Sequence, residues 1–303
     1  MMKPYTVVKH TGSRYLVSPL PLWEPVPCVL RGKIRLQGVS TTNPVAVGDK
    51  VEVADGVIKA VQARKNYIIR RSTNLSRQEH IIAANLDCAY LVVSLMLPQT
   101  PLEFIDRFLI TCEAYKVPVV ILLNKMDIHR EEIPEAVVRF KEIYEGAGYP
   151  VWETSALTGE GLDRLRMAIR QQVALFSGVS GVGKSSLINA LDSGLTLKTG
   201  EISDYHLKGK HTTTFYEMFP VAQGFVIDSP GIKGFGLVEV GKEEVYHFFP
   251  ELFKTAADCH FNPCSHTREP GCAVLAALER GKISTERYES YLKILDEEEG
   301  KYR

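Results

Sequence analysis

The hydrophobic positions of the chain change their period twice. Residues 1–80 contain short β-branched runs that alternate with polar residues and turn signals, which predicts β-strands. The stretch 47–62 alternates on both sides of Asp55-Gly56, so we expect a hairpin turn at this pair. Several short strands within about 80 residues predict a small barrel, and an OB-fold is the leading candidate.

The pattern from residue 81 to 235 alternates apolar strand-like runs with segments of helical spacing. We expect strands in 88–97, 117–124, 149–156 and 173–178, and helices in 101–115, 133–148 and 160–172. Strands that alternate with helices indicate a parallel sheet covered on both faces.

The last stretch, 236–303, is polar and helical. It contains a helix in 274–284 that we expect to stop at Gly281, followed by a final helix in 285–299. The three patterns of apolar and polar residues therefore predict three domains, at 1–80, 81–235 and 236–303.

The charge distribution separates the first domain from the rest of the chain. The formal net charge is zero, yet residues 1–80 hold 13 Lys/Arg against 5 Asp/Glu, a net of +8. This excess indicates either a polyanionic partner, most simply nucleic acid, or a solvated basic face. Tyr67 in this region is either a stacking ring or part of the core. The basic candidates are Arg31, Lys33, Arg35, Arg70, Arg71 and Arg77.

The sequence contains 45% apolar residues and has no secretory signal in its first 20 positions. Its longest apolar stretches, such as 117–123, are far shorter than a bilayer span. We therefore expect a cytoplasmic protein without a membrane contact.

The segment GVSGVGKS fits the phosphate-loop pattern G-x-x-x-x-G-K-[ST] between an apolar strand and a helix. Its glycines allow backbone N–H groups to face phosphate oxygens, while Lys184 reaches the terminal phosphates and the Ser185 hydroxyl ligates Mg²⁺. The residues assigned to this loop are Gly178, Val179, Ser180, Gly181, Val182, Gly183, Lys184, Ser185 and Ser186.

A candidate guanine reader precedes this loop in the chain. The NKMD segment comprises Asn124, Lys125, Met126 and Asp127 and follows an apolar strand. The Asp127 carboxylate can accept hydrogen bonds from guanine N1–H and its exocyclic amine, which adenine does not offer. The backbone at Ser155 and Ala156 in a later TSAL segment can donate to guanine O6.

Two further segments complete a GTP site. DSPG offers Asp228 to hold Mg²⁺ through water and the Gly231 N–H for the γ-phosphate, and GKHTTTF offers a threonine for the Mg²⁺ shell. The base reader comes before the phosphate loop, the reverse of the usual order, so the pattern predicts a circularly permuted GTPase domain. Because the strand at Asp228 now leads into the C-terminal domain, a change at the γ-phosphate is hypothesised to move that domain.

Four soft ligands cluster near the end of the chain in a C-x4-C-x-H-x5-C pattern: Cys259, Cys264, His266 and Cys272. Three thiolates and one imidazole suit a closed, structural Zn²⁺ site. His260 is a spare surface residue in this interpretation.

These motifs together resemble the circularly permuted GTPases of the RsgA type, which depend on the small ribosomal subunit. The resemblance extends over nearly the whole chain and includes RGKIR, AANLD (83–87) and all the motifs above. It implies an OB-fold, a GTPase domain and a zinc-binding domain in a bacterial factor that acts late in small-subunit maturation. It also implies Thr212 and Thr213 as switch threonines; we favour Thr213 for Mg²⁺, while the neighbouring Thr214 leaves the choice open.

The position after Gly231 is Ile232, which cannot orient an attacking water, so we expect slow intrinsic GTP hydrolysis and stimulation by the subunit. His211 is either a water-positioning residue or a loop histidine that faces RNA or solvent. The expected partners are GTP, GDP and the small ribosomal subunit with its rRNA, bound by a monomer. Two alternatives are a nucleotide-gated RNA-binding factor whose occupancy is its function, and a GTPase that acts on a non-ribosomal RNA.

Overall fold

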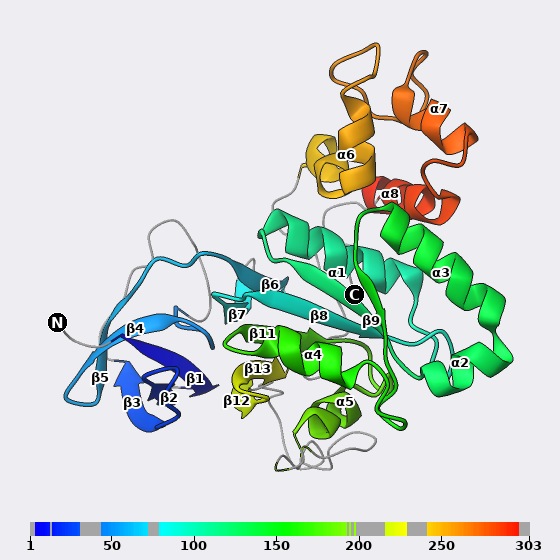
Figure 1. Cartoon of the computed structure of the whole chain (residues 1–303). Helices are drawn as coiled ribbons and strands as arrows, with labels where there is room; N and C mark the ends of the chain where they lie inside the picture. Colours follow the sequence, from blue (N-terminus) through cyan, green and yellow to red (C-terminus); the bar gives the residue numbers. More distant parts are fainter. Residues whose placement is uncertain are drawn as a thin grey trace, which may run out of the picture.

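The structure is a computed structural model that describes residues 4–12, 14–30, 44–71, 79–192, 194, 197, 216–228 and 241–296. Within these ranges the chain forms a small barrel, a central α/β layer structure and a helical C-terminal part (Figure 1). The predicted architecture of a barrel, a central α/β domain and a helical C-terminal part is therefore confirmed.

The barrel closes with five strands: β1 (Tyr5–Thr11), β2 (Arg14–Ser18), β3 (Val26–Leu30), β4 (Lys50–Ala54) and β5 (Val57–Val61). The pairing order β1-β2-β3-β5-β4 returns to β1, and β3 and β5 are parallel, as in an OB-like barrel. The predicted hairpin turn is present, because Asp55 and Gly56 both have positive φ between β4 and β5. Alternate residues fill the interior: Val7, Tyr15, Val17, Cys28, Val45, Val51 and Ile58.

A two-stranded ribbon, β6 (Tyr67–Arg71) and β7 (Glu79–Ala84), connects the barrel to the central sheet. The central strands are β8 (Cys88–Val93), β9 (Val119–Leu123), β10 (Val151–Glu153), β11 (Val173–Ser177), β12 (Glu217–Val221) and β13 (Gly224–Asp228). They lie in the order β10-β9-β8-β11-β13-β12, parallel except for β12. Strand β12 also pairs with β1, so barrel and central sheet are hydrogen-bonded into one sheet of 11 strands.

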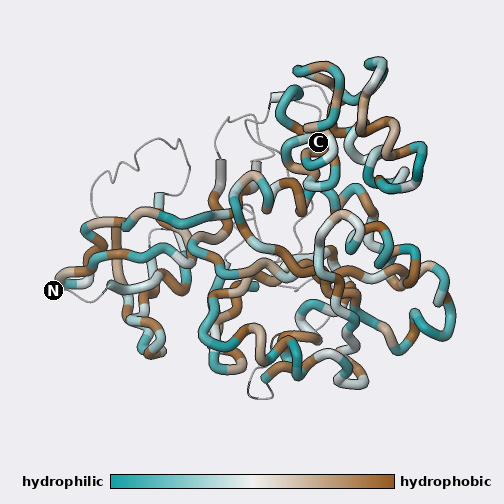
Figure 2. The backbone as a smooth tube through the Cα atoms, turned by 45° about the horizontal axis from the view of Figure 1, so that its top comes forward, coloured by the Kyte–Doolittle hydropathy of each residue, from teal (hydrophilic) through white to brown (hydrophobic). Residues whose placement is uncertain are grey.

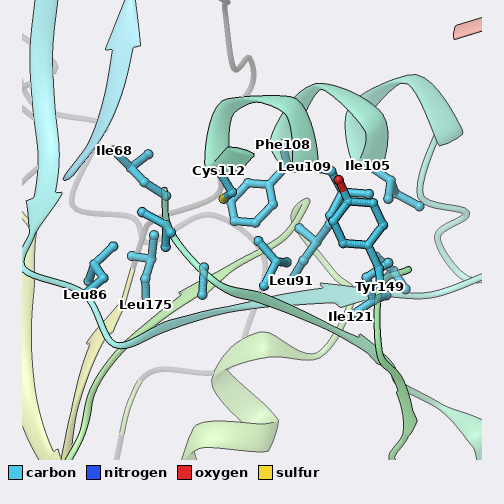
Figure 3. Close-up of a cluster of buried hydrophobic side chains, with 14 of the residues drawn as sticks. Ile68, Leu86, Leu91, Ile105, Phe108, Leu109, Cys112, Ile121, Tyr149 and Leu175 are labelled. Carbon is cyan, nitrogen blue, oxygen red and sulfur yellow. The ribbon is translucent and has the colours of Figure 1, made fainter. Parts of the chain in front are cut away.

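Helices cover both faces of this sheet because its parallel strands are apolar on both sides. On one face lie α1 (Leu102–Ala114) and α3 (Pro134–Gly146), on the other α4 (Leu162–Ile169) and α5 (Lys184–Leu191). Successive residues of β8 join opposite cores: Leu91 packs with the α1 and α3 side, shown in Figure 3, and Tyr90 with the α4 and α5 side. The apolar colouring in Figure 2 is accordingly concentrated along the central strands.

Two central elements were not expected from the sequence. The short helix α2 (Met126–Glu132) begins inside the NKMD motif, and β12 lies beside β13. Neither segment shows a period long enough to identify it, since each is seven residues or shorter.

The C-terminal part contains the 3₁₀ helix η2 (Lys242–Phe248) and the helices α6 (Pro250–Ala256), α7 (Ala273–Glu279) and α8 (Thr285–Asp296). It packs on α1 of the central domain (Figure 1) through a buried ion-pair cluster. Arg287 of α8 donates to Asp106 of α1 at 2.7 Å and to Glu251 of α6 at 2.7 Å, and its guanidinium lies 4.6 Å from the Phe249 ring centroid. Because the side chains of Arg287 and Asp106 are each only 1% exposed, their charges are stabilised by each other and not by water.

We predict that Arg287→Met lowers the free energy of unfolding by about 3–5 kcal/mol, because it leaves buried carboxylates without their cation. Urea denaturation followed by circular dichroism measures this change. Arg139→Met is the matched control, since Arg139 pairs with Glu286 at 2.7 Å but is 51% exposed. We expect the control to cost about 1 kcal/mol at most. Equal losses in the two variants would contradict the role assigned to burial.

Candidate functional site

The segments assigned to nucleotide binding leave the sheet at the same edge. NKMD follows β9, TSAL follows β10, the phosphate loop follows β11, and Asp228 ends β13. These four strands are parallel members of one sheet, so their carboxyl ends lie side by side. Crevices at this edge, beyond the ends of parallel strands, are the common ligand sites of open α/β sheets.

Two glycines of the phosphate loop have positive φ angles. Gly178 has φ +157° and Gly183 has φ +94°, and a Cβ atom at Gly183 would lie 2.4 Å from the Asn124 amide nitrogen. Helix α5 begins at Lys184, so its first N–H groups point into the loop. This arrangement suits the binding of an anionic polyphosphate.

The Lys184 ammonium is directed by an ion pair across the loop. Its Nζ lies 2.8 Å from the Asp228 carboxylate, and the Lys184 side chain is only 9% exposed. Asp228 lies next to β11, the strand before the phosphate loop, because it pairs with Phe176 of that strand. The structure thus brings the lysine of the phosphate loop and the aspartate of DSPG into direct contact.

Two side chains of NKMD fasten the base reader to the phosphate loop. The buried Asn124 amide donates to the Val182 carbonyl at 2.8 Å. Lys125 donates to the Gly181 carbonyl at 2.9 Å and also to the Leu97 carbonyl. Segments almost 60 residues apart in the sequence, in reversed order, are therefore joined directly.

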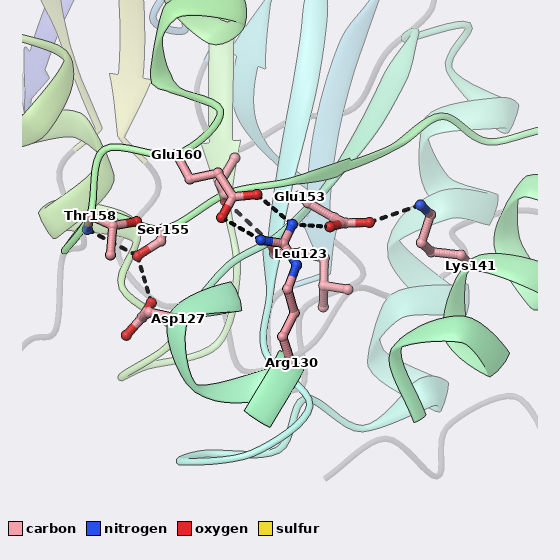
Figure 4. A network of polar contacts seen from close by, with 9 residues as sticks. Leu123, Asp127, Arg130, Lys141, Glu153, Ser155, Thr158 and Glu160 are labelled. Carbon is pink, nitrogen blue, oxygen red and sulfur yellow. Dashed lines mark hydrogen bonds and ion pairs between the residues drawn. The ribbon is translucent and has the colours of Figure 1, made fainter. Parts of the chain in front are cut away.

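The TSAL loop meets Asp127 through a side-chain contact (Figure 4). The Ser155 hydroxyl donates to the Asp127 carboxylate at 2.5 Å and accepts from the Thr158 N–H at 3.2 Å. The Ser155 N–H donates to the Glu160 carbonyl at 3.1 Å, so it is not free to meet a guanine O6 as the sequence suggested. Among the described residues, none accepts the Ala156 N–H.

Several predicted residues lie outside the described part of the chain. These are Arg31, Lys33, Arg35, Arg77, His211, Thr212, Thr213, Thr214, Gly231 and Ile232. The side chains of Arg70 and Arg71 are likewise not described. Tyr67 is described and packs against Tyr115, with ring centroids 4.8 Å apart. This contact agrees with the core alternative for Tyr67.

The four predicted metal ligands come together in the C-terminal part. The ligand atoms of Cys259, Cys264, His266 and Cys272 all lie within 4.8 Å of one another. The Cys259 and Cys272 sulfurs are 3.9 Å apart, and His266 Nδ1 is 3.6 and 3.5 Å from them. Tetrahedral Zn²⁺ bonds of ordinary length give edges of about 3.8 Å between sulfurs and about 3.6 Å between sulfur and nitrogen.

Burial favours the neutral forms of the thiols and the imidazole in this cluster. Burial raises the pKa of the Cys264 thiol to about 12 and also raises the pKa of Cys272. Burial lowers the pKa of His266. A zinc ion deprotonates such thiols and binds neutral imidazole, so the geometry of the cluster makes it compatible with zinc. The spare His260 is exposed and packs edge-on against Phe261 instead.

A contact network around Arg130 was missed from the sequence. Arg130 of α2 binds Glu153 at the end of β10 and Glu160 after the TSAL segment. Its only signal in the sequence is its position three residues after Asp127, which does not reveal its partners.

In the described part of the chain, every helix is too short or too polar to cross a bilayer.

Comparisons with known proteins agree with this geometry. A model of the RsgA GTPase family matches residues 61–238. A curated relative from Bacteroides fragilis, named small ribosomal subunit biogenesis GTPase RsgA, is 53% identical over 98% of both chains, and one of the same name from Porphyromonas gingivalis is 50% identical over 96% of both. The crystal structure of YjeQ from Thermotoga maritima superposes with a TM-score of 0.78 at 34% identity, covering 97% of this chain and 98% of that one. YloQ, a circularly permuted GTPase, gives 0.72 at 25% identity, with coverage of 97% and 94%.

We predict that Gly183→Ala weakens GDP binding about tenfold or more, because the new Cβ displaces Asn124 from the phosphate loop. Isothermal titration calorimetry measures the change. Gly148→Ala is the control, because Gly148 has a similar φ of +97° but nothing within 4 Å of the added atom. An equal loss of GDP affinity in both variants would show that the effect comes from the strain of a side chain at positive φ and not from the Asn124 contact.

Proposed function

This chain belongs to the RsgA GTPase family, and from that premise we propose that it hydrolyses GTP to GDP and phosphate on the small ribosomal subunit, late in its maturation. The observation that carries the proposal is the direct contact of the base reader with the phosphate loop, made by Asn124 and Lys125. It supports one GTP site built from two exchanged halves of the chain.

Guanine selection rests on the pairing of Asp127 with the TSAL loop. With Ser155 donating to one carboxylate oxygen, Asp127 keeps acceptor capacity for the guanine N1–H and amine. The Ala156 N–H serves O6. Adenine offers neither set of partners, so GTP is the substrate and ATP is not.

The phosphate end of the site uses Lys184, Ser185 and Asp228. A bound polyphosphate competes with Asp228 for the Lys184 ammonium and leaves this carboxylate available to waters of Mg²⁺. A Mg²⁺ ion bound with GTP would supply positive charge against the charge that develops on the phosphates. Thr213, with Thr212 nearby, remains the proposed switch ligand, Gly231 the proposed γ-phosphate contact, and His211 a candidate for water positioning.

The ribosomal partner is proposed from charge and from the relatives. The first 80 residues have a net charge of +8, which suits rRNA, and the relatives' name refers to small-subunit biogenesis. Because Ile232 cannot orient water, the subunit is proposed to supply or order the missing group. We propose that the protein acts as a monomer in the cytoplasm, where subunits mature.

The domain limits remain those proposed from sequence, at 1–80, 81–235 and 236–303. The last strand of the barrel core is β5. The proposed boundary at residue 80 lies within β7, so the β6–β7 ribbon connects the barrel to the central domain. We further propose one structural zinc ion at Cys259, Cys264, His266 and Cys272, since four protein ligands leave no open position for catalysis.

We predict that purified small subunits raise steady-state GTP hydrolysis by about 10³-fold or more, while ATP is not hydrolysed in either condition. Phosphate release measured with and without subunits gives the result, and Lys184→Ala is the inactive control. Tight GTP binding without stimulation would remove the ribosomal partner, and footprinting on other RNAs would follow. Stable trapping of Ser185→Ala on the subunit would indicate that hydrolysis serves release, the alternative in which occupancy is the function.

We predict one equivalent of zinc in the purified protein and its loss in Cys264→Ser, with a decrease in the helical signal of the C-terminal part. Elemental analysis and circular dichroism measure both effects. His260→Ala is the matched control, because this neighbouring histidine is outside the cluster. Full zinc content in Cys264→Ser would rule out the proposed ligand set.

A further inference from the structure

An exposed arginine links the two parts of the base reader. Arg130 lies on α2, one turn after Asp127, and its side chain is 50% exposed. Its guanidinium binds both oxygens of Glu160, at 2.9 and 2.5 Å, and Glu153 at 2.5 Å (Figure 4). The planar fork of an arginine can hold two carboxylates in a fixed direction, which a lysine cannot.

Glu160 is the residue through which Arg130 reaches the base reader. The Glu160 carbonyl accepts the Ser155 N–H, while its carboxylate is held by Arg130. Ser155 in turn donates its hydroxyl to Asp127. The contacts therefore form a closed ring that runs from Arg130 through Glu160 and Ser155 to Asp127 and back along one turn of α2.

Glu153 anchors the other end of the TSAL loop. It is the last residue of β10, directly before Thr154, and Lys141 of α3 binds its second oxygen at 2.8 Å. Arg130 therefore holds the loop at the residue before it and at a residue after it. No other described side chain bridges α2 to both ends of this loop.

We propose that Arg130 is a positioning residue for guanine selection. By fixing the loop against α2, it sets the distance between the Asp127 carboxylate and the Ala156 N–H. These groups have to match the N1–H and amine on one side of the guanine edge and O6 on the other. The inference rests on the proposed GTP site and adds a residue that touches neither the base nor the phosphates.

The competing interpretation is that Arg130 forms a surface ion pair with no role in guanine selection. Such exposed pairs contribute little to the free energy of unfolding. The two interpretations differ in how they treat the base. A stabilising pair affects every nucleotide equally. A positioning residue affects most the nucleotide that uses every contact of the reader.

The test compares GDP with IDP, which lacks the exocyclic amine and so forgoes one hydrogen bond to Asp127. Isothermal titration calorimetry in Mg²⁺ buffer gives both dissociation constants for the wild-type protein, Arg130→Met and Arg130→Lys. We expect Arg130→Met to weaken GDP binding about threefold to tenfold and IDP binding less, so that the GDP preference falls. Arg130→Lys should fall between wild type and Arg130→Met, because it retains the charge but not the fork.

Two further variants sharpen the result. Arg139→Met removes an arginine of equal exposure that binds both oxygens of Glu286, outside the base reader, and should leave both constants unchanged. Arg130→Met combined with Glu160→Gln should lower the GDP preference no further than Arg130→Met alone, since both changes break the same ring.

An unchanged GDP preference in Arg130→Met would overturn the inference, even if both nucleotides bound more weakly. A wild-type protein that failed to prefer GDP over IDP would overturn the proposed base reader, and this inference with it. The two failures are thus distinguished by the wild-type measurement.

Discussion

Parallel pairing of β8 with β11 is the contact on which the nucleotide site depends. It joins the half of the sheet that carries the base reader to the half that carries the phosphate loop. The Asp87 N–H donates to the Val173 carbonyl, and the Asp87 carboxylate accepts the Val173 N–H, so the pairing is held from its first residues. Once the strands are neighbours, NKMD and the phosphate loop have to emerge at one edge, whatever their order in the chain.

The same sheet ties the site to the barrel. Strand β13 ends at Asp228, and its hairpin partner β12 pairs with β1 of the barrel, where Lys9 and Glu217 also form an ion pair at 2.8 Å. Trp23 of the barrel stacks on Phe225 of β13, with ring centroids 5.9 Å apart. The hairpin that carries a magnesium-site candidate is therefore also the attachment of the barrel.

The sequence was sufficient where a local pattern and its chemistry coincided. The alternation around Asp55-Gly56, the apolar run of β9 and the spacing of the cysteine cluster predicted a turn, a buried strand and a group of soft ligands, all of which are present. It was insufficient where a role depends on the path of a loop or on a partner distant in the chain. The Ser155 N–H meets the Glu160 carbonyl because of the local loop path, and Arg130 meets two carboxylates that follow it by 23 and 30 residues.

The strength of the two attachments bears on which part moves when the nucleotide changes. Movement of the C-terminal part relative to α1 would separate Arg287 from Asp106, two buried charges whose separation costs about 3–5 kcal/mol. The barrel is held by the β1–β12 strand pairing, by the Trp23–Phe225 stack and by Val8 and Val47, which are buried in the central core. Its ion pair of Lys9 with Glu217 is more open, with side chains 34% and 35% exposed. Water can replace the partner of an exposed charge, so this ion pair adds little and the attachment of the barrel depends on its buried contacts. A change at the γ-phosphate should therefore not separate the C-terminal part from α1. That part should follow α1 as one body, which modifies the movement hypothesised from the order of the motifs.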